Sequence, residues 1–489
     1  MKFQVFTATL ATLAIFSASL QSAHADPKEY YYQQYLKRLA AAAAKKSPFG
    51  DPRRMSDPSV IPAAPAVAAQ AGAFDQRINP DDASDTRTFK QRYWISTTYS
   101  HGENSPVLYF ICGEAECSAG DLGGATSQHA QKLGATVVAL EHRYFGKSQP
   151  FPEMTTANMK YLTTSNALKD LATFQTFTMQ KLNLKGKWVS IGGSYPGALS
   201  AYYRLKFPNL IAGSLASSAP VLARANFEEY DHHVFKVAGP DCAKVMQQVT
   251  SSVEAAMQDP QKALAMKTLF GGKEIIDTVD FLYVVADMGA IAIQYDHRDQ
   301  LCDAIQGASD PVKAYAQVGR QLFADFGMTP LQDTPQAMLS TKASDYSSGV
   351  GLRQWTYLIC NEYGYYQTAF HDPKESVRSS KIDLNYHNTM CKRVFGITTP
   401  VNAAATNRNF YQPLLNAQTK NIYFTNGAND PWSNLSITQK NGNATNPNLA
   451  FDLIAGAAHC DDLGLKNSSA LQDSRARFVS LASKWTNAR

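Results

Sequence analysis

The sequence lacks the usual marks of three classes of protein. It has no C-x-x-C pair, and its seven cysteines are spaced too widely for a common zinc ligand pattern. After residue 25, no stretch reaches the roughly 18 uninterrupted apolar residues that a membrane-spanning helix needs. No Lys/Arg cluster alternates with aromatic residues in the manner of nucleic-acid-binding surfaces. We therefore expect no metal or other cofactor, no membrane span and no nucleic-acid partner.

A surplus of one sign of charge is also missing from most of the chain. Of the net charge of +5, Lys2 contributes one and residues 26–73, with seven Lys or Arg against four Asp or Glu, contribute three, which leaves +1 for the rest. A chain that is nearly neutral over this length offers no extended positive surface for nucleic acid. The 489 residues, 44% of them hydrophobic, suffice for one large core or two moderate ones.

The first residues predict export. Lys2 is followed by an apolar run to Phe16, and Ala23-His24-Ala25 has the small-x-small pattern of a cleavage site. We interpret residues 1–25 as a secretory signal peptide and the mature protein as periplasmic or secreted to the extracellular space. Residues 26–73 combine a helix-favouring Ala/Leu segment with five prolines after residue 47, and we expect an Ala/Pro-rich arm or linker there.

Export also makes disulfides the expectation for the cysteines, although an odd number leaves at least one thiol unpaired. The order of the cysteines along the chain suggests the pairs Cys112–Cys117, Cys242–Cys302 and Cys360–Cys391.

From Phe74 onward, short apolar runs alternate with helical or turn segments, which indicates a parallel α/β sheet with right-handed crossovers. A helix is expected over Thr164–Leu182. The expected strands are Tyr93–Thr97, Val107–Cys112, Ala135–Glu141, Trp188–Gly192, Ala212–Ala216, Asn421–Thr425 and Ala450–Ile454.

One long interval interrupts this alternation. Between residues 224 and 418 the strands largely stop, and helical patterns such as FLYVVADMGAIAIQY replace them. We expect a helical cap at 224–418, inserted into a sheet domain made of residues 74–223 and 419–489. Because ligands bind at the carboxyl ends of parallel strands, the cap should shape access to the site.

The stretch VSIGGSYPGALS, residues 189–200, brings an apolar strand, two glycines, Ser194 and a helix-like segment together. A serine on a sharp strand-to-helix turn exposes its hydroxyl to substrate, so Ser194 is the candidate nucleophile. The usual pattern is G-x-S-x-G; Gly192 fits it, whereas Pro196 stands at the second glycine position and Gly197 follows one residue later. The alternative is a glycine-rich turn with a structural serine.

A nucleophilic serine needs a base and an acid that orients the base. In an α/β-hydrolase they follow the serine in the order acid, then histidine, each after a later strand. Asp430 follows the apolar run NIYFTNG, and His459 follows LAFDLIAG. Asp430 could instead only cap a turn before Pro431, and His459 could be an ordinary core or surface residue. The shared order and placement of the three residues favours a triad.

The oxyanion formed during acyl transfer needs two backbone N–H donors. We expect one from Tyr195, directly after the candidate nucleophile, and one from Gly113 or Glu114 in the loop after the strand that begins at Val107. Glu114 is also a candidate for binding the positive amino terminus of a substrate.

Six segments of the sequence resemble the marker segments of the prolyl carboxypeptidase family of serine peptidases, in order from about Phe74 to the C-terminus. They read FDQRINPDDASDTRTFKQRYW, EHRYFGKSQPF, GGSYPGALSAYYRLKFP, WTYLICNEYGYYQT, NGANDPW and AAHCDDL. The resemblance implies an α/β-hydrolase domain with an inserted helical cap, and exopeptidase activity that favours proline before the scissile bond. It also implies the triad Ser194, Asp430 and His459, with Trp432 beside the proline pocket. Trp355, Tyr363 and Tyr365 could face this pocket from the cap; the alternative is that these aromatic residues only pack the joint between cap and sheet.

The sequence departs from that family at three places: Pro196 replaces a common glycine, the loop reads Cys112-Gly113-Glu114-Ala115 instead of Asn-Glu-Gly, and Cys460 stands where a second histidine is frequent. Two alternatives stay open, a lipase or esterase on the same fold and a catalytically inactive binding protein. Carboxypeptidase, dipeptidyl peptidase and endopeptidase activity are not distinguished, and neither are a monomer and a homodimer.

Overall fold

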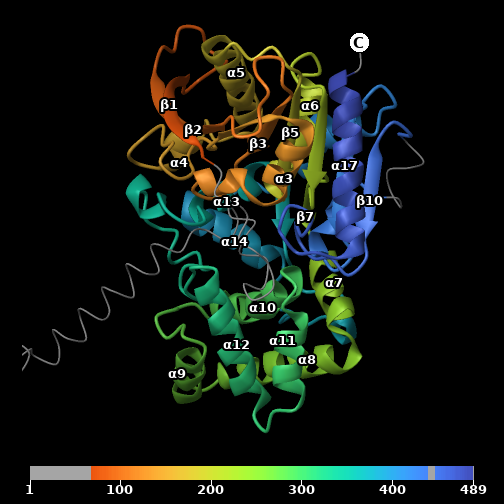
Figure 1. Ribbon diagram of the computed structural model, residues 1–489. Coiled ribbons are helices and arrows are strands. Elements are labelled where there is room, and N and C mark those ends of the chain that lie inside the picture. The colour runs from red at the N-terminus through yellow and green to blue at the C-terminus, as the bar shows by residue number, and fades with distance from the viewer. Residues whose placement is uncertain (1–67, 439–445, 488–489) are drawn as a thin grey trace, which may run out of the picture. The chain divides into compact units, whose positions relative to one another are not determined.

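The computed structural model describes residues 68–438 and 446–487. The predicted signal peptide and most of the predicted arm lie outside the described residues. The centre of the described chain is an eight-stranded sheet with the order β1-β2-β4-β3-β5-β6-β9-β10 (Figure 1). Its strands are β1 (Gln70–Arg77), β2 (Thr88–Ser96), β3 (Val107–Ile111), β4 (Thr136–Leu140), β5 (Trp188–Gly193), β6 (Gly213–Ser217), β9 (Ile422–Gly427) and β10 (Ala450–Ile454).

The sheet is parallel from β4 to β10, and β1 and β2 pair antiparallel at one edge. The central strands β3, β4 and β6 are buried at every residue, as strands covered on both faces must be. All seven expected strands are present within two residues at their ends except β2, which begins earlier, at Thr88. The strand β1 was not expected; it begins at Gln70, inside the range assigned to the arm.

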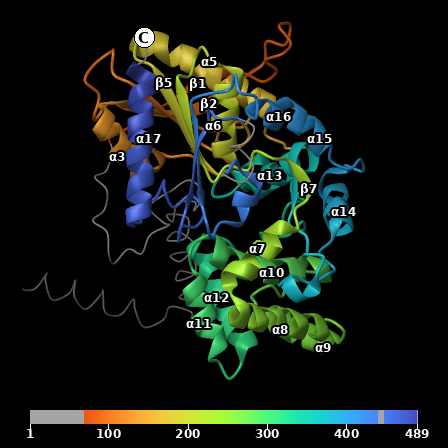
Figure 2. The ribbon, with the colours of Figure 1, turned by 90° about the vertical axis from the view of Figure 1, so that its right-hand side faces the viewer.

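Helices cover both faces of the sheet. Figure 2 shows α3 (Gly124–Leu133) and α17 (Ser469–Asn487) on one side, and α6 (Tyr195–Lys206) on the other. The helix α5 (Thr164–Leu182) packs beside α6 and has the bounds expected from the sequence. Phe478 and Trp485 of α17 share one apolar cluster with Leu108 and Ile191 of the sheet. The pairing of β5 with β6, β6 with β9 and β9 with β10 places the carboxyl ends of these parallel strands at one edge of the sheet.

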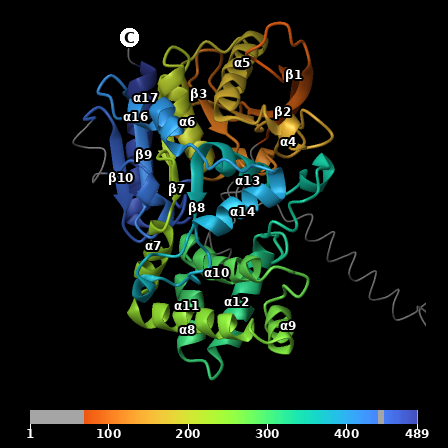
Figure 3. The same cartoon turned by 180° about the vertical axis from the view of Figure 1, so that it is seen from behind.

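Between β6 and β9 the chain is mainly helical, as expected. Figure 3 shows the short parallel pair β7 (Arg224–Asn226) and β8 (Gly364–Tyr366) beside the helix α13 (Leu352–Leu358). The helices of this interval are α7 (Glu229–Ala238), α8 (Pro240–Ala256), α9 (Pro260–Leu269), α10 (Thr278–Gln294), α11 (Arg298–Gln306), α12 (Pro311–Asp325), α13 (Leu352–Leu358), α14 (Leu384–Phe395), α15 (Ala403–Thr406) and α16 (Gln412–Leu414). The predicted fold class, an α/β-hydrolase fold with a helical cap, is confirmed.

Three disulfides join the cysteine pairs suggested by the sequence: Cys112–Cys117, Cys242–Cys302 and Cys360–Cys391. The second holds α8 to α11 and the third holds the segment after α13 to α14. Cys460 is left as a free, buried thiol. No helix among the described residues is long and apolar enough to span a membrane. The same residues contain no group of three His, Cys, Asp or Glu placed to hold a metal ion.

Candidate active site

Ser194 stands at a sharp turn between β5 and α6. Its backbone has φ 63° and ψ −133°, a conformation that a residue with a side chain rarely adopts. The turn requires glycine on both sides, because a Cβ at Gly192 would lie 2.1 Å from the Pro196 carbonyl oxygen and one at Gly197 would lie 2.6 Å from that of Ser217. Gly197 thus provides the close approach that the usual pattern assigns to the position of Pro196, whose ring occupies the first turn of α6.

Asp430 and His459 meet on the loops after β9 and β10. Nδ1 of His459 donates to Oδ2 of Asp430 at 2.8 Å, and both side chains are buried. The other oxygen, Oδ1, accepts the N–H of Trp432 at 3.0 Å, so Asp430 both caps the turn at Pro431 and orients the imidazole. This bond fixes the tautomer in which Nε2 of neutral His459 carries the lone pair.

The next two acids along the chain have other partners. Asp461 accepts the N–H of Ala458 and pairs with Lys466. Asp462 accepts the hydroxyls of Ser217 and Thr425, which tie the histidine loop to the sheet. Neither carboxylate bonds to the imidazole, so Asp430 is its acidic partner.

The loop that carries His459 lies against the turn that carries Ser194. A Cβ at Gly193 would come within 2.9 Å of Sγ of Cys460, and the N–H of Cys460 donates to Oγ of Ser218 at 2.9 Å. Nε2 of His459 is buried and has no hydrogen-bond partner within the described residues. Among the residues that the structure describes, Oγ of Ser194 makes no hydrogen bond to His459. The structure therefore brings the three candidate residues to adjacent loops and leaves Nε2 with an unused lone pair.

The acid beside the imidazole stabilises its protonated form. Burial lowers the pKa of His459, but the charge of Asp430 and its hydrogen bond to the imidazole outweigh the effect of burial, and the pKa lies above the ordinary histidine value. In acyl transfer the base becomes an imidazolium, so a partner that stabilises this charge favours the step.

Glu114 lies in the loop after β3, close to His459. Burial raises the pKa of its carboxyl to about 7, and the charge of His459 only partly opposes this shift. The carbonyl oxygen of Glu114 accepts the N–H of Gly351 at 2.8 Å, which ties this loop to the start of α13. Gly113 touches the ring of Pro196, so the loop approaches the turn of Ser194 closely.

Tyr195 is the first residue of α6, where backbone N–H groups have no partner inside the helix. Its side chain is held by His142, a residue that no sequence pattern indicated. Nδ1 of His142 donates to the Arg143 carbonyl at 2.7 Å, so its Nε2 accepts the hydroxyl of Tyr195, 3.1 Å away. Burial lowers the pKa of His142 to about 4, which keeps this acceptor neutral. His142 lies in EHRYFGKSQPF, one of the six segments that resemble the prolyl carboxypeptidase family.

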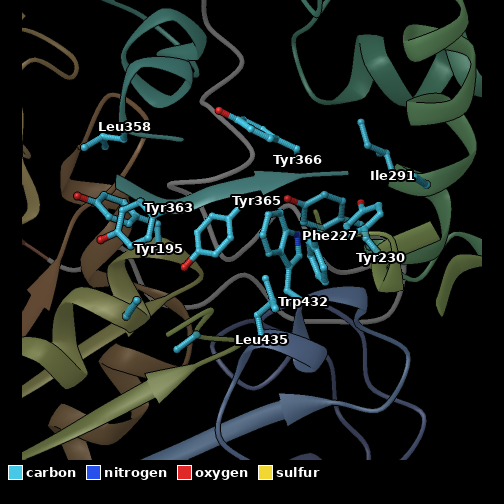
Figure 4. Packing of buried hydrophobic residues seen from close by; sticks show 14 of the residues in the cluster. Tyr195, Phe227, Tyr230, Ile291, Leu358, Tyr363, Tyr365, Tyr366, Trp432 and Leu435 are labelled. Carbon is cyan, nitrogen blue, oxygen red and sulfur yellow. The ribbon is translucent and has the colours of Figure 1, made fainter. Parts of the chain in front are cut away.

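A row of aromatic side chains leads away from Tyr195. Its ring lies 6.0 Å from that of Tyr363, Tyr363 lies 5.0 Å from Tyr365, and Tyr365 lies 5.5 Å from Trp432. Figure 4 shows the row continuing to Tyr230, whose ring is 5.7 Å from Trp432. The Tyr363–Tyr365 pair is stacked and the other three contacts are edge-to-face, the two arrangements that aromatic rings favour, so the row forms an apolar wall.

The two tryptophans expected at the site occupy different places in this wall. Trp432 is buried, and its Nε1 donates to Oε1 of Gln294 at the end of α10 at 2.9 Å. Trp355, on α13, lies 5.4 Å from Tyr195 and 6.3 Å from Tyr365, ring to ring. The two are joined through Tyr365 and are not in direct ring contact.

A mainly parallel sheet with a serine at the turn after β5, an acid after β9 and a histidine after β10 defines the α/β-hydrolase class. The chain belongs to the serine carboxypeptidase S28 family, which it matches over residues 76–477, and it is a serine peptidase. The predicted resemblance to the prolyl carboxypeptidase family is thereby confirmed.

Two relatives that are similar in sequence are named serine proteases. The chain is 37% identical over 378 residues to a probable serine protease of Arabidopsis thaliana, covering 74% of this chain and 75% of the relative. It is 30% identical over 432 residues to the thymus-specific serine protease of Mus musculus, covering 82% of this chain and 83% of the relative. Among solved structures, a lipase in an open form is 13% identical and superposes with a TM-score of 0.38. The superposition covers 86% of this chain and 100% of the lipase chain.

Proposed function

We propose that this peptidase is an exported exopeptidase that prefers proline before the scissile bond and works through an acyl-enzyme on Ser194. The observation that carries the proposal is the buried Asp430–His459 pair, whose Nε2 stays unbonded beside the turn of Ser194. The strained backbone of Ser194 supports it, because such strain persists where function requires it.

In the proposed mechanism, Oγ of Ser194 attacks the carbonyl carbon of the scissile bond while Nε2 of His459 takes the hydroxyl proton. Asp430 holds Nδ1–H and stabilises the imidazolium. The N–H groups of Tyr195 and of Gly113 or Glu114 stabilise the oxyanion. The imidazolium then gives its proton to the leaving amine as the C–N bond breaks. Water, deprotonated by His459, hydrolyses the acyl-enzyme and releases the acid.

The aromatic row supports the preference for proline. A proline ring is compact and apolar, and its imide nitrogen has no hydrogen to bond, so an aromatic wall accepts it without leaving a buried donor unpaired. Trp432 lies two residues after Asp430 and is held in place by Gln294, which suits it to form one side of this pocket. Trp355 would contribute from α13.

Export is supported by the three disulfides, since such bonds persist in oxidising compartments. The predicted signal peptide lies outside the described residues. A mature N-terminus after Ala25, found by mass spectrometry of protein from the culture medium or periplasm, would test this part of the proposal.

Two measurements test the chemistry. A fluorophosphonate probe should label Ser194 in the wild type and not in Ser194→Ala, with His459 intact in both; absence of labelling would support an inactive binding protein. Matched peptide and ester substrates with proline or alanine before the scissile bond should show faster cleavage after proline in the peptides. Preference for the esters would support the lipase or esterase alternative.

The type of cleavage follows from a digest of one proline-containing peptide, blocked in turn at each end. If a blocked amino end stops cleavage, the enzyme removes residues from that end, and if a blocked carboxyl end does so, it is a carboxypeptidase. Equal cleavage of both blocked forms would overturn exopeptidase activity and leave the triad unaffected.

A further inference from the structure

Glu141 and His142 directly follow β4, a strand that carries none of the triad residues. In the sheet, β3 lies between β4 and β5, so the carboxyl ends of these three parallel strands lie side by side. The loop after β3 and the start of α6 after β5 are the two segments expected to supply the oxyanion donors. The residues after β4 therefore lie next to both segments.

The carboxylate of Glu141 holds the loop after β3. Its side chain is fully buried, and Oε1 accepts the N–H of Cys117 at 3.1 Å. Oε2 accepts the N–H of Lys147 at 3.1 Å and the hydroxyl of Ser148 at 2.7 Å. A Cβ at Gly146 would lie 2.1 Å from Oε1, so the carboxylate is tightly enclosed on that side.

The bond to Cys117 reaches the expected donors through a disulfide. Cys117 is joined to Cys112, which directly precedes Gly113, so the loop is closed at its base. The outer part of the loop is tied at the Glu114 carbonyl to the start of α13. Because Glu141 fixes the closed base, the placement of the loop N–H groups depends on its carboxylate.

The imidazole of His142 holds the segment that carries the other donor. Its Nε2 accepts the hydroxyl of Tyr195 at 3.1 Å, while its Nδ1 donates to the Arg143 carbonyl at 2.7 Å. The ring of Tyr195 also lies 5.4 Å from that of Trp355 and 6.0 Å from that of Tyr363. The first residue of α6 is thus held both at its hydroxyl and at its ring.

Both contacts bear on one requirement of acyl transfer. Two N–H groups must converge on the same oxygen, and an error of about 1 Å in placement can cost about 100-fold in rate. The contact of Gly113 with Pro196 limits how closely the two donor segments approach each other. The bonds to Glu141 and His142 limit how far the same segments move apart.

We propose that Glu141 and His142 are positioning residues that together set the spacing of the two oxyanion donors. This inference rests on the proposed acyl transfer at Ser194. Glu141 acts through Cys117 and the disulfide, and His142 acts through the hydroxyl of Tyr195. Neither side chain needs to touch the substrate.

The test replaces each residue in two ways. Glu141→Gln and His142→Gln each keep a side-chain oxygen that can accept the bond, whereas Glu141→Leu and His142→Leu provide no acceptor. The Leu variants should lower kcat for a proline-containing peptide by about 10- to 100-fold at an unchanged KM, and the Gln variants should retain most of the activity. His129→Leu, at a buried histidine of α3, is the matched control and should leave kcat unchanged.

Two inhibitors separate positioning from a loss of stability. When a peptide that ends in prolinal binds, Oγ of Ser194 adds to the aldehyde carbon, its proton passes to His459, and the aldehyde oxygen occupies the oxyanion site. The same peptide with a proline carboxylate is the cleavage product and forms no such adduct. In each Leu variant, the Ki of the aldehyde should rise by the factor by which kcat falls, while the Ki of the product stays unchanged.

A double-variant comparison assigns each residue to its donor. Tyr195→Phe removes the hydroxyl that His142 holds, so His142→Leu should add little further loss of kcat to it. Glu141→Leu acts on the other donor and should add its full loss to Tyr195→Phe.

The outcomes separate the two proposals. A wild type that neither cleaves the peptide nor reacts with a fluorophosphonate at Ser194 would overturn the acyl-transfer mechanism itself. A labelled, active wild type whose folded Leu variants keep kcat would overturn only the positioning role. Equal losses in the Gln and Leu variants would also overturn it, as would a product Ki that rises together with that of the aldehyde.

A second set of variants covers a failure to fold, which melting temperatures would reveal. If His142→Leu does not fold, Tyr195→Phe breaks the same hydrogen bond. If Glu141→Leu does not fold, Cys112→Ala combined with Cys117→Ala frees the same loop at its base. Each replacement should show the same fall in kcat and the same rise in the Ki of the aldehyde, and normal values in either would overturn the role of the residue that it represents.

Discussion

Gly113 and Pro196 touch so closely that a Cβ at position 113 would lie 2.2 Å from Cγ of the proline ring. The contact joins the loop after β3 to the first turn of α6, the two segments expected to supply the oxyanion donors. A proline in place of the common glycine at position 196 therefore makes glycine at position 113 obligatory.

This contact predicts a coupled pair of variants. Gly113→Ala should lower kcat by about 100-fold, because the methyl group pushes one oxyanion donor away from its position. Pro196→Gly should restore much of that activity in the double variant, and steady-state kinetics on the four proteins measure the coupling. Additive losses would mean that the contact does not position the loop.

Ser194→Gly should abolish hydrolysis and raise the thermal stability above that of Ser194→Ala. Glycine adopts a positive φ without strain, so relief at φ 63° is worth about 1 kcal/mol in the free energy of unfolding. Calorimetry on the two inactive variants makes the comparison free of any effect of catalysis. Equal melting temperatures would show that the turn stores no strain.

The Asp430–His459 pair predicts the pH profile. His459 acts as a base only when neutral, so kcat/KM should rise as the pH passes upward through its raised pKa. Asp430→Asn removes the charge that raises this pKa. It should move the rise to lower pH and lower kcat by about 10⁴, because the imidazole loses its tautomer. Asp461→Asn is the neighbouring control; an equal shift there would contradict the assignment of Asp430.

Glu114 predicts a change of stability with pH. Its pKa rises from 4.5 to about 7 on folding, so the folded state binds the proton more tightly and stability falls as the pH rises between these values. Glu114→Gln should unfold like the wild type below pH 4.5 and be more stable above pH 7, by about 3 kcal/mol. Urea titrations at pH 4.5 and 8 test this; a variant less stable at pH 8 would show that the charged carboxylate is stabilised in the fold.

Trp432 should determine the preference for proline. Trp432→Ala should lower kcat/KM for proline substrates more than for alanine substrates, by about 1 to 3 kcal/mol in the difference of activation free energies. Trp432→Phe keeps a ring and loses only the hydrogen bond to Gln294, so it should retain most of the discrimination. Equal losses of kcat/KM for the proline and alanine substrates would show that Trp432 only packs against its neighbours.

The sequence predicted the sheet because its central strands are continuous apolar runs, as in VLYFI of β3 and TVVAL of β4. It also placed Ser194, Asp430 and His459 after the strands that carry them, since the order of acid and base along the chain follows from the fold. The strand β1 was not predicted, because QAGAFDQR contains small residues and follows a proline-rich segment.

Contacts between distant residues could not be predicted in this way. His142 and Tyr195 are 53 positions apart, and a histidine in a polar loop has no periodic signal that would indicate its partner. Asp287 and Arg378 are 91 positions apart, and only the folded chain shows that they pair. Spacing in the sequence reports local structure, whereas the partners of buried polar groups depend on the packing of whole elements.

The hydrogen bond from the N–H of His459 to the carbonyl of Gln294 makes the helix α10 an anchor of the histidine loop. The side chain of the same residue accepts the N–H of the Trp432 indole. One glutamine at the end of α10 therefore links the loop that carries His459 to the turn that follows Asp430. A shift of this end of α10 would disturb the positions of the base and of the segment beside its acid together, so the geometry of the site depends on a helix that contributes no member of the triad.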